Sequence, residues 1–239
     1  MGGNRVTGKL AVVGGASGVP DRAPTRRQRG FTLIEISIAV IALGLVVGCS
    51  IIAQDMLQMA KVKGLANDFT TVKAAINAYQ DAFRALPGDD PNVSTHVPGA
   101  VSLAGPGVGN GLIDGMWNST SPMDESLVFW QHVRLANLVS GATDLGTPGF
   151  GPRNHVDGIF GVSSATPSQL QISGMRGTFQ ACSSKIPGKI ANRLILQLGH
   201  GSSDSAETRA VPDDSPPGAP AASVAMLDDG AAYTVCHVF

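Results

Sequence analysis

The chain has 239 residues, of which 43% are hydrophobic and only 5% aromatic, and it contains 30 Gly and 15 Pro. This length supports one buried core with an appended segment, and the Gly and Pro content predicts a loop-rich globular part. The net charge of −1 hides an asymmetry, because residues 1–30 hold six of the 17 basic residues and one of the 18 acidic ones, a net +5. Residues 31–239 hold eleven basic and seventeen acidic residues, and this acidic body argues against nucleic acid as its main partner.

Residues 1–30 are interpreted as a leader peptide, because they are rich in Gly and Arg and lack helical periodicity. Residues 31–53 follow, a run of 23 residues with one charge, Glu35. At about 1.5 Å per residue, this run is long enough to cross the hydrocarbon core of a bilayer, about 30 Å thick. Basic charge before an apolar run and acidic charge after it is the positive-inside pattern, so we expect a cytoplasmic N-terminus and an exported body.

Helical spacing continues beyond residue 53, and no proline occurs between Phe31 and Pro87. Apolar residues recur alternately by four and by three, which predicts an amphipathic helical half over 54–86. The sequence LPGDDP at 86–91 then ends the helix, so we expect one continuous helix of about 55 residues. The apolar stripe consists of Leu65, Phe69, Val72, Ile76, Tyr79 and Phe83.

Residues 87–239 form the predicted globular head. A loop over 88–123 leads into a second predicted helix over 121–141, which Ser121 or Asp124 could cap. We expect an α+β fold, in which the long helix, with its first half transmembrane, packs on a small antiparallel β-sheet with long loops. The candidate strands are QLQIS at 169–173, RLILQL at 193–198 and AAYTVCHVF at 231–239, and a polar, Pro-rich segment at 199–223 separates the last two.

The three cysteines fall into two classes. Cys49 lies near the end of the apolar run, whereas Cys182 and Cys236 lie in the exported body. Two cysteines in an oxidising compartment predict a disulfide, which would tie down the C-terminal region and stabilise the fold by a few kcal/mol.

The sequence RGFTLIE at 29–35, which opens the apolar run, resembles the type III signal of type IV pilins and type II secretion pseudopilins. The sequence AYQDAFRALPGDD at 78–90 also resembles the end of the long helix in pseudopilin-like proteins. The resemblance implies that a membrane-bound prepilin peptidase cleaves after Gly30 and methylates Phe31, the new N-terminal residue. It implies a structural subunit of a pilus or secretion pseudopilus, not an enzyme.

The resemblance also implies a location and partners. We expect a single-pass inner-membrane protein with a periplasmic head, which later enters a pilus or pseudopilus or reaches the cell surface. The implied partners are other pilin or pseudopilin subunits in a homo- or heteropolymer, the prepilin peptidase, the inner-membrane assembly platform and membrane lipid, with no nucleic acid.

Glu35 needs a physical reason, because a lone carboxylate in hydrocarbon costs about 2.5 kcal/mol or more. Cleavage would create a cationic α-amine on Phe31, one helical turn before Glu35, so the acid of one subunit can neutralise the terminus of the next. Such a buried pair would set the axial offset between packed helices. Gly44 and Gly48 form a small-xxx-small pair that allows close helix approach, or alternatively soften the helix where many pilins carry a proline.

A second hypothesis comes from Val46-Val47-Gly48-Cys49, which resembles a lipobox behind a basic n-region. Lipidation of Cys49 would make the chain a membrane-tethered periplasmic binding domain that does not polymerise. Glu35 fits poorly inside a signal-peptide apolar region, and Cys49 can also be an ordinary small residue of a span.

The head shows no enzyme signature and no recognisable cofactor motif, and its histidines lack ligand spacing. Acidic and amide side chains in the loops could gather into a calcium site, because calcium takes six to eight oxygen ligands. The alternative is that they are solvated turn residues beside Gly and Pro. These candidates are Asp89, Asp90, Asn110, Asp114, Asp228 and Asp229.

Overall fold

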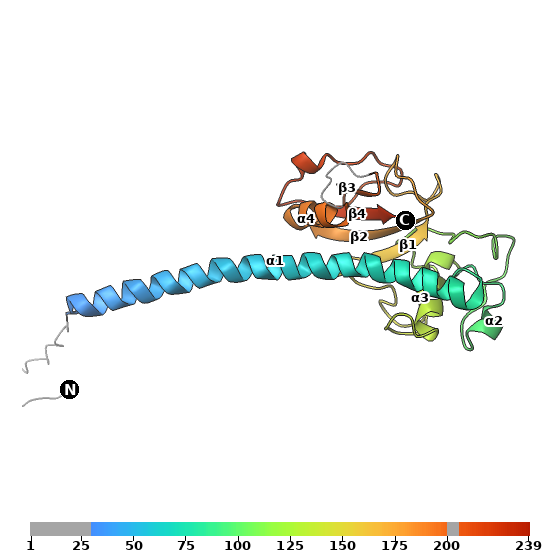
Figure 1. Ribbon diagram of the computed structural model, residues 1–239, viewed down its shortest axis with the longest axis horizontal. Coiled ribbons are helices and arrows are strands. Elements are labelled where there is room, and N and C mark those ends of the chain that lie inside the picture. Colours follow the sequence, from blue (N-terminus) through green and yellow to red (C-terminus); the bar gives the residue numbers. More distant parts are fainter. Residues whose placement is uncertain (1–29, 200–205) are drawn as a thin grey trace, which may run out of the picture. The chain divides into compact units, whose positions relative to one another are not determined.

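A computed structural model describes residues 30–199 and 206–239, so the predicted leader, except Gly30, lies outside the described residues. The chain divides into two units, Met1–Gly48 and Cys49–Phe239. Helix α1 (Leu33–Phe83) begins in the first unit and continues through the second (Figure 1). The described part of the first unit is thus mainly an apolar helix, and the second unit holds the whole globular head.

Helix α1 confirms the predicted continuous helix and is 51 residues long. Thr32 precedes it, and the Thr32 carbonyl and hydroxyl oxygens accept hydrogen bonds from Glu35 N at 3.1 and 3.3 Å. A threonine here is favoured because its side chain satisfies an amide that has no partner inside the helix. The helix ends at Phe83, and Arg84 takes a positive φ of 56°. Pro87 follows, and a proline disfavours helical geometry in the residue before it.

The predicted apolar stripe packs the second half of α1 against the head. The Phe69 and Phe160 rings meet edge to face, with their centroids 5.2 Å apart. Tyr79 is fully buried near the end of the helix, whereas Phe83 is only partly buried. The buried members on this face include Val62, Leu65, Phe69, Val72, Ile76 and Tyr79.

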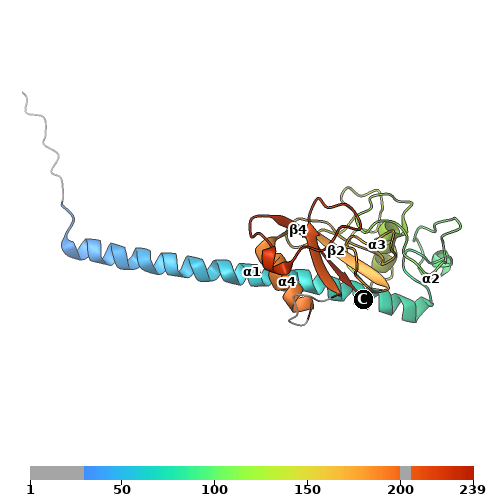
Figure 2. The ribbon, with the colours of Figure 1, turned by 90° about the horizontal axis from the view of Figure 1, so that it is seen from above.

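The head is a four-stranded antiparallel sheet with the strand order β1-β2-β4-β3. Figures 1 and 2 show the second half of α1 running along this sheet. One hydrophobic core joins α1, α3, α4 and the sheet, so the predicted α+β class is confirmed. The elements after α1 are α2 (Val93–His96), α3 (Glu125–Leu135), β1 (Phe160–Ser164), β2 (Phe179–Pro187), α4 (Gly188–Leu198), β3 (Thr208–Pro212), the 3-10 helix η1 (Val224–Met226) and β4 (Ala232–Val238).

Several predictions within the head were wrong in detail. RLILQL at 193–198 belongs to helix α4, because Ile190, Leu194 and Ile195 share a buried face at helical spacing. QLQIS at 169–173 is not a strand; it contains one isolated bridge, from Ile172 to Ala219. The predicted helix over 121–141 is shorter, and the strand over 231–239 is confirmed as β4.

The sequence reading also missed β1, β2 and β3, and β3 lies inside the segment interpreted as a polar linker. Buried polar side chains explain the omission of β1 and β2. Gln180 of β2 is fully buried, and its Nε2 donates to Ser163 Oγ at 3.0 Å and to the Gln169 carbonyl oxygen at 2.5 Å. Polar groups satisfied in this way can occupy a sheet interior, so the strands do not show the alternation of apolar residues that indicates a strand.

The predicted disulfide joins Cys182 of β2 to Cys236 of β4. The two residues are direct partners in the antiparallel register, and both are fully buried. The bond therefore links the two central strands of the sheet.

Candidate assembly site

The Gly30–Phe31 peptide bond lies just before α1 begins, where both residues are exposed. The Phe31 side chain is 76% exposed, and nothing lies within 4 Å of the position that a Cβ on Gly30 would take. The bond is therefore accessible to a protease, and a side chain at position 30 would meet no part of the described chain.

Glu35 lies in the first turn of α1 and is exposed. Its backbone amide donates to Thr32, but within residues 30–199 and 206–239 no hydrogen bond or ion pair involves its carboxylate. The four residues from Phe31 to Glu35 correspond to about 6 Å along a helix axis. A group that neutralises Glu35 must therefore come from outside the described chain or from the terminus created at Phe31.

The apolar side chains in this part of α1 are uncovered on every side, because each residue from Phe31 to Cys49 is exposed. In the described part of the chain, α1 is the one helix long and apolar enough to cross a membrane by length and composition. A surface of this size needs lipid or other apolar helices as its environment. The large members are Phe31, Leu33, Ile34, Ile36, Ile38, Val40, Ile41, Leu43, Leu45, Val46 and Val47, each at least 55% exposed.

Gly44 and Gly48 differ from the third glycine of α1. A Cβ on Gly64 would lie 2.5 Å from Cδ2 of His155, so packing inside the head explains that glycine. Nothing lies within 4 Å of the corresponding positions at Gly44 and Gly48. The described chain therefore supplies no internal reason for these two glycines. Cys49, which follows them, is a free, exposed cysteine.

The candidate calcium residues are only partly brought together. Asp89 accepts hydrogen bonds from three successive amides: Gly109 N, Asn110 N at 3.2 Å and Gly111 N at 2.7 Å. Asp114 accepts from Asn110 Nδ2 at 3.0 Å and from Gln169 Nε2 at 3.1 Å.

Asp228, by contrast, accepts a hydrogen bond from Gly230 N in its own turn, which also contains Asp229. Across the described residues, no group of three or more His, Cys, Asp or Glu side chains is arranged to hold a metal ion. The carboxylates of Asp89 and Asp114 organise the loop over 105–116 through hydrogen bonds.

Glu125 is a member of this cluster that sequence reasoning missed. It is 4% exposed, and its Oε2 accepts a hydrogen bond from Asp114 N at 2.8 Å. Burial is the main cause that raises the pKa of Glu125 to about 7; the nearby carboxylates of Asp89 and Asp114 act in the same direction, and the Asp114 amide opposes them. Glu125 therefore retains a proton near neutral pH that an exposed glutamate would have lost.

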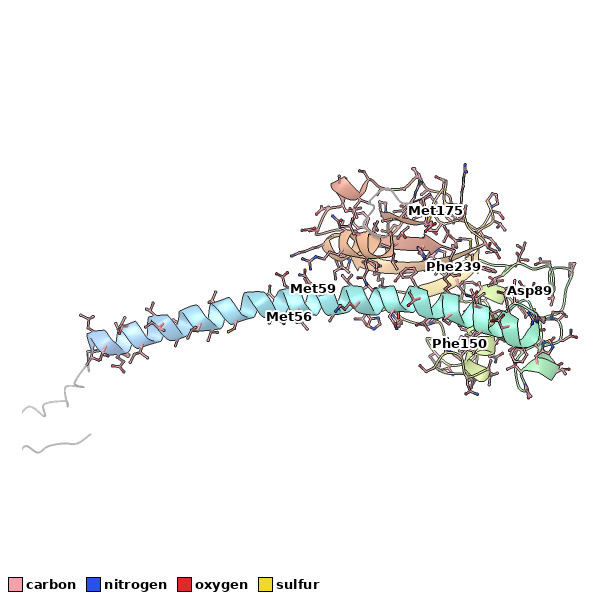
Figure 3. All side chains as sticks on the ribbon, in the orientation of Figure 1. Met56, Met59, Asp89, Phe150, Met175 and Phe239 are labelled. Carbon is pink, nitrogen blue, oxygen red and sulfur yellow. A yellow bond between two sulfur atoms is a disulfide. The ribbon has the colours of Figure 1, made fainter. Side chains whose placement is uncertain are left out.

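Asp90 organises the turn after α1. Its fully buried carboxylate accepts from Tyr79 Oη at 2.8 Å and from Asn92 N at 2.9 Å, and it lies 2.7 Å from His96 Nδ1. Burial raises the pKa of Tyr79, as does Asp90, so the hydroxyl stays protonated and donates. Figure 3 places the neighbouring Asp89 at the C-terminal end of α1.

His132 holds the same turn from α3. Its Nδ1 accepts a hydrogen bond from Gly88 N at 3.0 Å, and its Nε2 lies 2.9 Å from the Val101 carbonyl oxygen. Burial lowers the pKa of His132, so the ring is neutral at pH 7 with its proton on Nε2. The role of His132 depends on contacts 31 and 44 residues away, which no local motif shows.

Comparison with known proteins bears on the N-terminal region. A family model described as the prokaryotic N-terminal methylation motif matches residues 25–48. The matched residues include Gly30, Phe31, Glu35, Gly44 and Gly48, and they end before the head begins. A search of curated proteins finds no match to this chain.

Proposed function

For a chain that carries the prepilin signature of type IV pilins and pseudopilins, we propose a structural role as a polymer subunit. Prepilin peptidase removes the leader 1–30 after Gly30 and methylates Phe31. The mature protein then assembles through residues 31–53 into a pilus or pseudopilus, with 54–86 as the amphipathic half of its helix and 87–239 as its head. The observation that supports this proposal most is the fully exposed apolar run from Phe31 to Cys49, in which Glu35 is the one carboxylate.

Cleavage supplies what Glu35 lacks. The new α-amine on Phe31 is a cation two residues before α1 begins, and Glu35 follows four residues later, in the first turn. Between two adjacent copies, the carboxylate of one and the amine of the other satisfy each other in a low-dielectric environment, where an unpaired charge is costly. The pair fixes the axial offset, while apolar side chains provide most of the contact area. Gly44 and Gly48 allow the helices to approach closely.

The topology of the chain fits this role. The basic region before the apolar run favours a cytoplasmic N-terminus, which sends the head to the periplasm. The Cys182–Cys236 disulfide in the head is consistent with that oxidising compartment. The subunit then meets the peptidase, the assembly platform and its fellow subunits at the inner membrane.

Mass spectrometry of the protein purified from native membranes tests the processing step. We expect a mature chain that begins at N-methylated Phe31. A chain that retains residues 1–30, or one that begins at a diacylated Cys49, would contradict the proposal, and the latter would support a lipid-anchored tether. Gly30→Leu should leave the full-length precursor in the membrane, whereas Gly44→Leu, as a control at a glycine whose Cβ position is open, should be processed normally.

A further inference from the structure

Helix α4 meets α1 two residues after the apolar run ends. Arg193 Nη2 of α4 lies 3.7 Å from Asp55 Oδ1 of α1. Figures 1 and 2 both show α4 beside this section of α1. Helix α4 therefore reaches α1 at Asp55, before burial of α1 against the head starts at Val62.

The section of α1 at this level keeps apolar side chains uncovered. Met56, Leu57 and Met59 are 68%, 64% and 56% exposed, and burial against the head starts at Val62. Figure 3 labels Met56 and Met59 on this section. Lys61 and Lys63 follow and are also exposed.

Helix α4 adds an outward face of the same character. Its buried face packs on the core through Ile190, Leu194 and Ile195. Lys189 and Leu196 are exposed on α4, and Leu196 is 39% exposed; Arg193, between them at helical spacing, is partly buried and turned toward Asp55 of α1. We call the combined surface the collar; it consists of Met56, Leu57, Met59, Lys61, Lys63, Lys189, Arg193 and Leu196.

The helix rise fixes the depth of the collar in a membrane. Residues 31–53 form about 35 Å of helix, which is enough to cross the hydrocarbon core of about 30 Å. Each headgroup layer adds about 5–8 Å, which residues 54–58 cross; Lys61 and Lys63 lie about 12 and 15 Å beyond residue 53, so their long side chains must reach back toward the headgroups. Because Arg193 contacts Asp55, α4 lies at the same depth as the headgroups.

We propose that the collar binds the headgroups of anionic phospholipids and holds the head on the membrane surface before assembly. The inference rests on the proposed function, because it requires residues 31–53 to span the bilayer. Three of the four collar cations, Lys61, Lys63 and Lys189, face an anionic partner, because Arg193 is already paired with Asp55. Exposed apolar side chains interleaved with cations suit an anionic interface, where the former enter between headgroups and the latter contact phosphates.

A second copy of the chain is the competing occupant. A copy inserted at the same depth presents the same four cations, and like charges repel. Anionic lipid supplies the opposite charge at this depth without any subunit offset, so the charges favour lipid.

The test uses the full mature chain in vesicles of phosphatidylcholine with or without phosphatidylglycerol. Cys49→Ser removes the one free thiol, and Leu196→Cys then carries a fluorophore that a headgroup nitroxide can quench. Met123→Cys, at a 71% exposed site before α3, is the matched control position. We expect quenching at Leu196→Cys to be severalfold stronger in vesicles with phosphatidylglycerol than in those without it, and little quenching at Met123→Cys in either.

Neutralising the collar gives the quantitative test. Each cation near an anionic surface raises the equilibrium constant for binding that surface about fivefold. The triple variant Lys61→Gln, Lys63→Gln and Lys189→Gln should therefore lower the equilibrium constant for docking of the head on phosphatidylglycerol on the order of a hundredfold. The control variant Arg84→Gln, Arg153→Gln and Arg176→Gln removes the same charge from exposed sites outside the collar and should leave quenching at 196 unchanged.

A probe at Val40→Cys, read with an acyl-chain nitroxide, separates this inference from the proposed function. If the probe at position 40 is quenched but the probe at position 196 shows as little quenching as the one at position 123, the collar proposal is overturned, while residues 31–53 still span the bilayer. If 40 is not quenched, both fail. If the probe at position 196 becomes less accessible to the quencher as the protein-to-lipid ratio rises, whether or not phosphatidylglycerol is present, a second copy covers the collar. This result also overturns the proposal.

Discussion

The Tyr79 hydroxyl donates a 2.8 Å hydrogen bond to the fully buried carboxylate of Asp90, and so ties the last turns of α1 to the chain that leaves it. The bond closes a turn that also involves Gly88 and His132 of α3. The end of α1 is thus fixed to the head by buried polar contacts as well as by the apolar stripe.

Tyr79→Phe tests this relationship. The variant leaves a buried carboxylate with one donor fewer, which we expect to destabilise the head by about 1.5–3 kcal/mol. Denaturant unfolding of the full chain in detergent, followed by tryptophan fluorescence, measures the loss. Tyr233→Phe removes a neutral bond from Asp228 N at 2.9 Å and should cost less. Equal losses for the two variants would show that Asp90 does not depend on Tyr79.

Glu125 gives a pH-dependent prediction. Its pKa is raised from 4.5 to about 7 in the folded state, so the folded protein binds more protons than the unfolded chain between these values. The contribution of Glu125 to stability is therefore fully present below about pH 4.5 and is lost as the pH rises through about 7. At pH 8, Glu125→Gln should stabilise the head by about 1–3 kcal/mol, because the amide needs no proton and can still accept from Asp114 N.

Unfolding curves for the wild type and Glu125→Gln from pH 4 to pH 8 check the sign. The difference between them should grow with pH, whereas Asp229→Asn, at an exposed turn residue, should follow the wild type. A difference that shrinks with rising pH would contradict a raised pKa.

The disulfide between Cys182 and Cys236 closes a sequence separation of 54 residues. Loop-closure entropy predicts that its loss costs about 4 kcal/mol. Reductant should therefore lower the unfolding midpoint of the wild type and increase cleavage of the C-terminal region by protease. Cys49→Ser should change neither, because that residue lies outside the bond. An unchanged midpoint after verified reduction would assign the stability of β2 and β4 to packing alone.

Substitutions at Gly44 and Gly48 should affect assembly of the subunits without affecting folding of the single chain. Because their Cβ positions are open in the single chain, Gly44→Leu and Gly48→Leu should insert, be processed and fold as the wild type does. Filament yield should fall severalfold, since the added side chains hold the helices apart. Ala42→Leu, about 200° around the helix from Gly44, is the size-matched control. Normal yields for both glycine variants would leave the small-xxx-small pair without a role.

The sequence predicted the parts of the fold whose signals are local and periodic. The stripe from Leu65 to Tyr79 predicted α1 and the face that it buries, and the short run AAYTVCHVF at 231–239, with its β-branched and aromatic residues, predicted β4. The β-strands that contain Ser163 and Gln180 were missed, because buried hydrogen bonds replace apolar side chains there. Six consecutive residues of α4 resembled a strand, because RLILQL contains only two polar residues, Arg193 and Gln197, which lie four apart and so can also share a helix face.

The candidate site divides in the same way. The processing motif and Glu35 are contiguous, so they can be identified from the sequence. The cluster of Asp89, Asp114 and Glu125 joins segments up to 36 residues apart, and only the fold shows which carboxylates meet. The reason for Gly64 likewise lies far away in the sequence, because the side chain that packs on it belongs to His155, 91 residues later.

The central claim is that Glu35 of one subunit pairs with the α-amine on Phe31 of a neighbour. The most direct measurement uses filaments assembled from equal amounts of nitrogen-15-labelled and unlabelled subunits, treated with a membrane-soluble carbodiimide that joins a carboxylate to an amine in contact. We predict a cross-linked peptide pair between residues 31 and 35 that contains one labelled and one unlabelled member in about half of the products, as random mixing of copies requires. Intact filaments that give no such cross-link, or only products within a single chain, would contradict the claim.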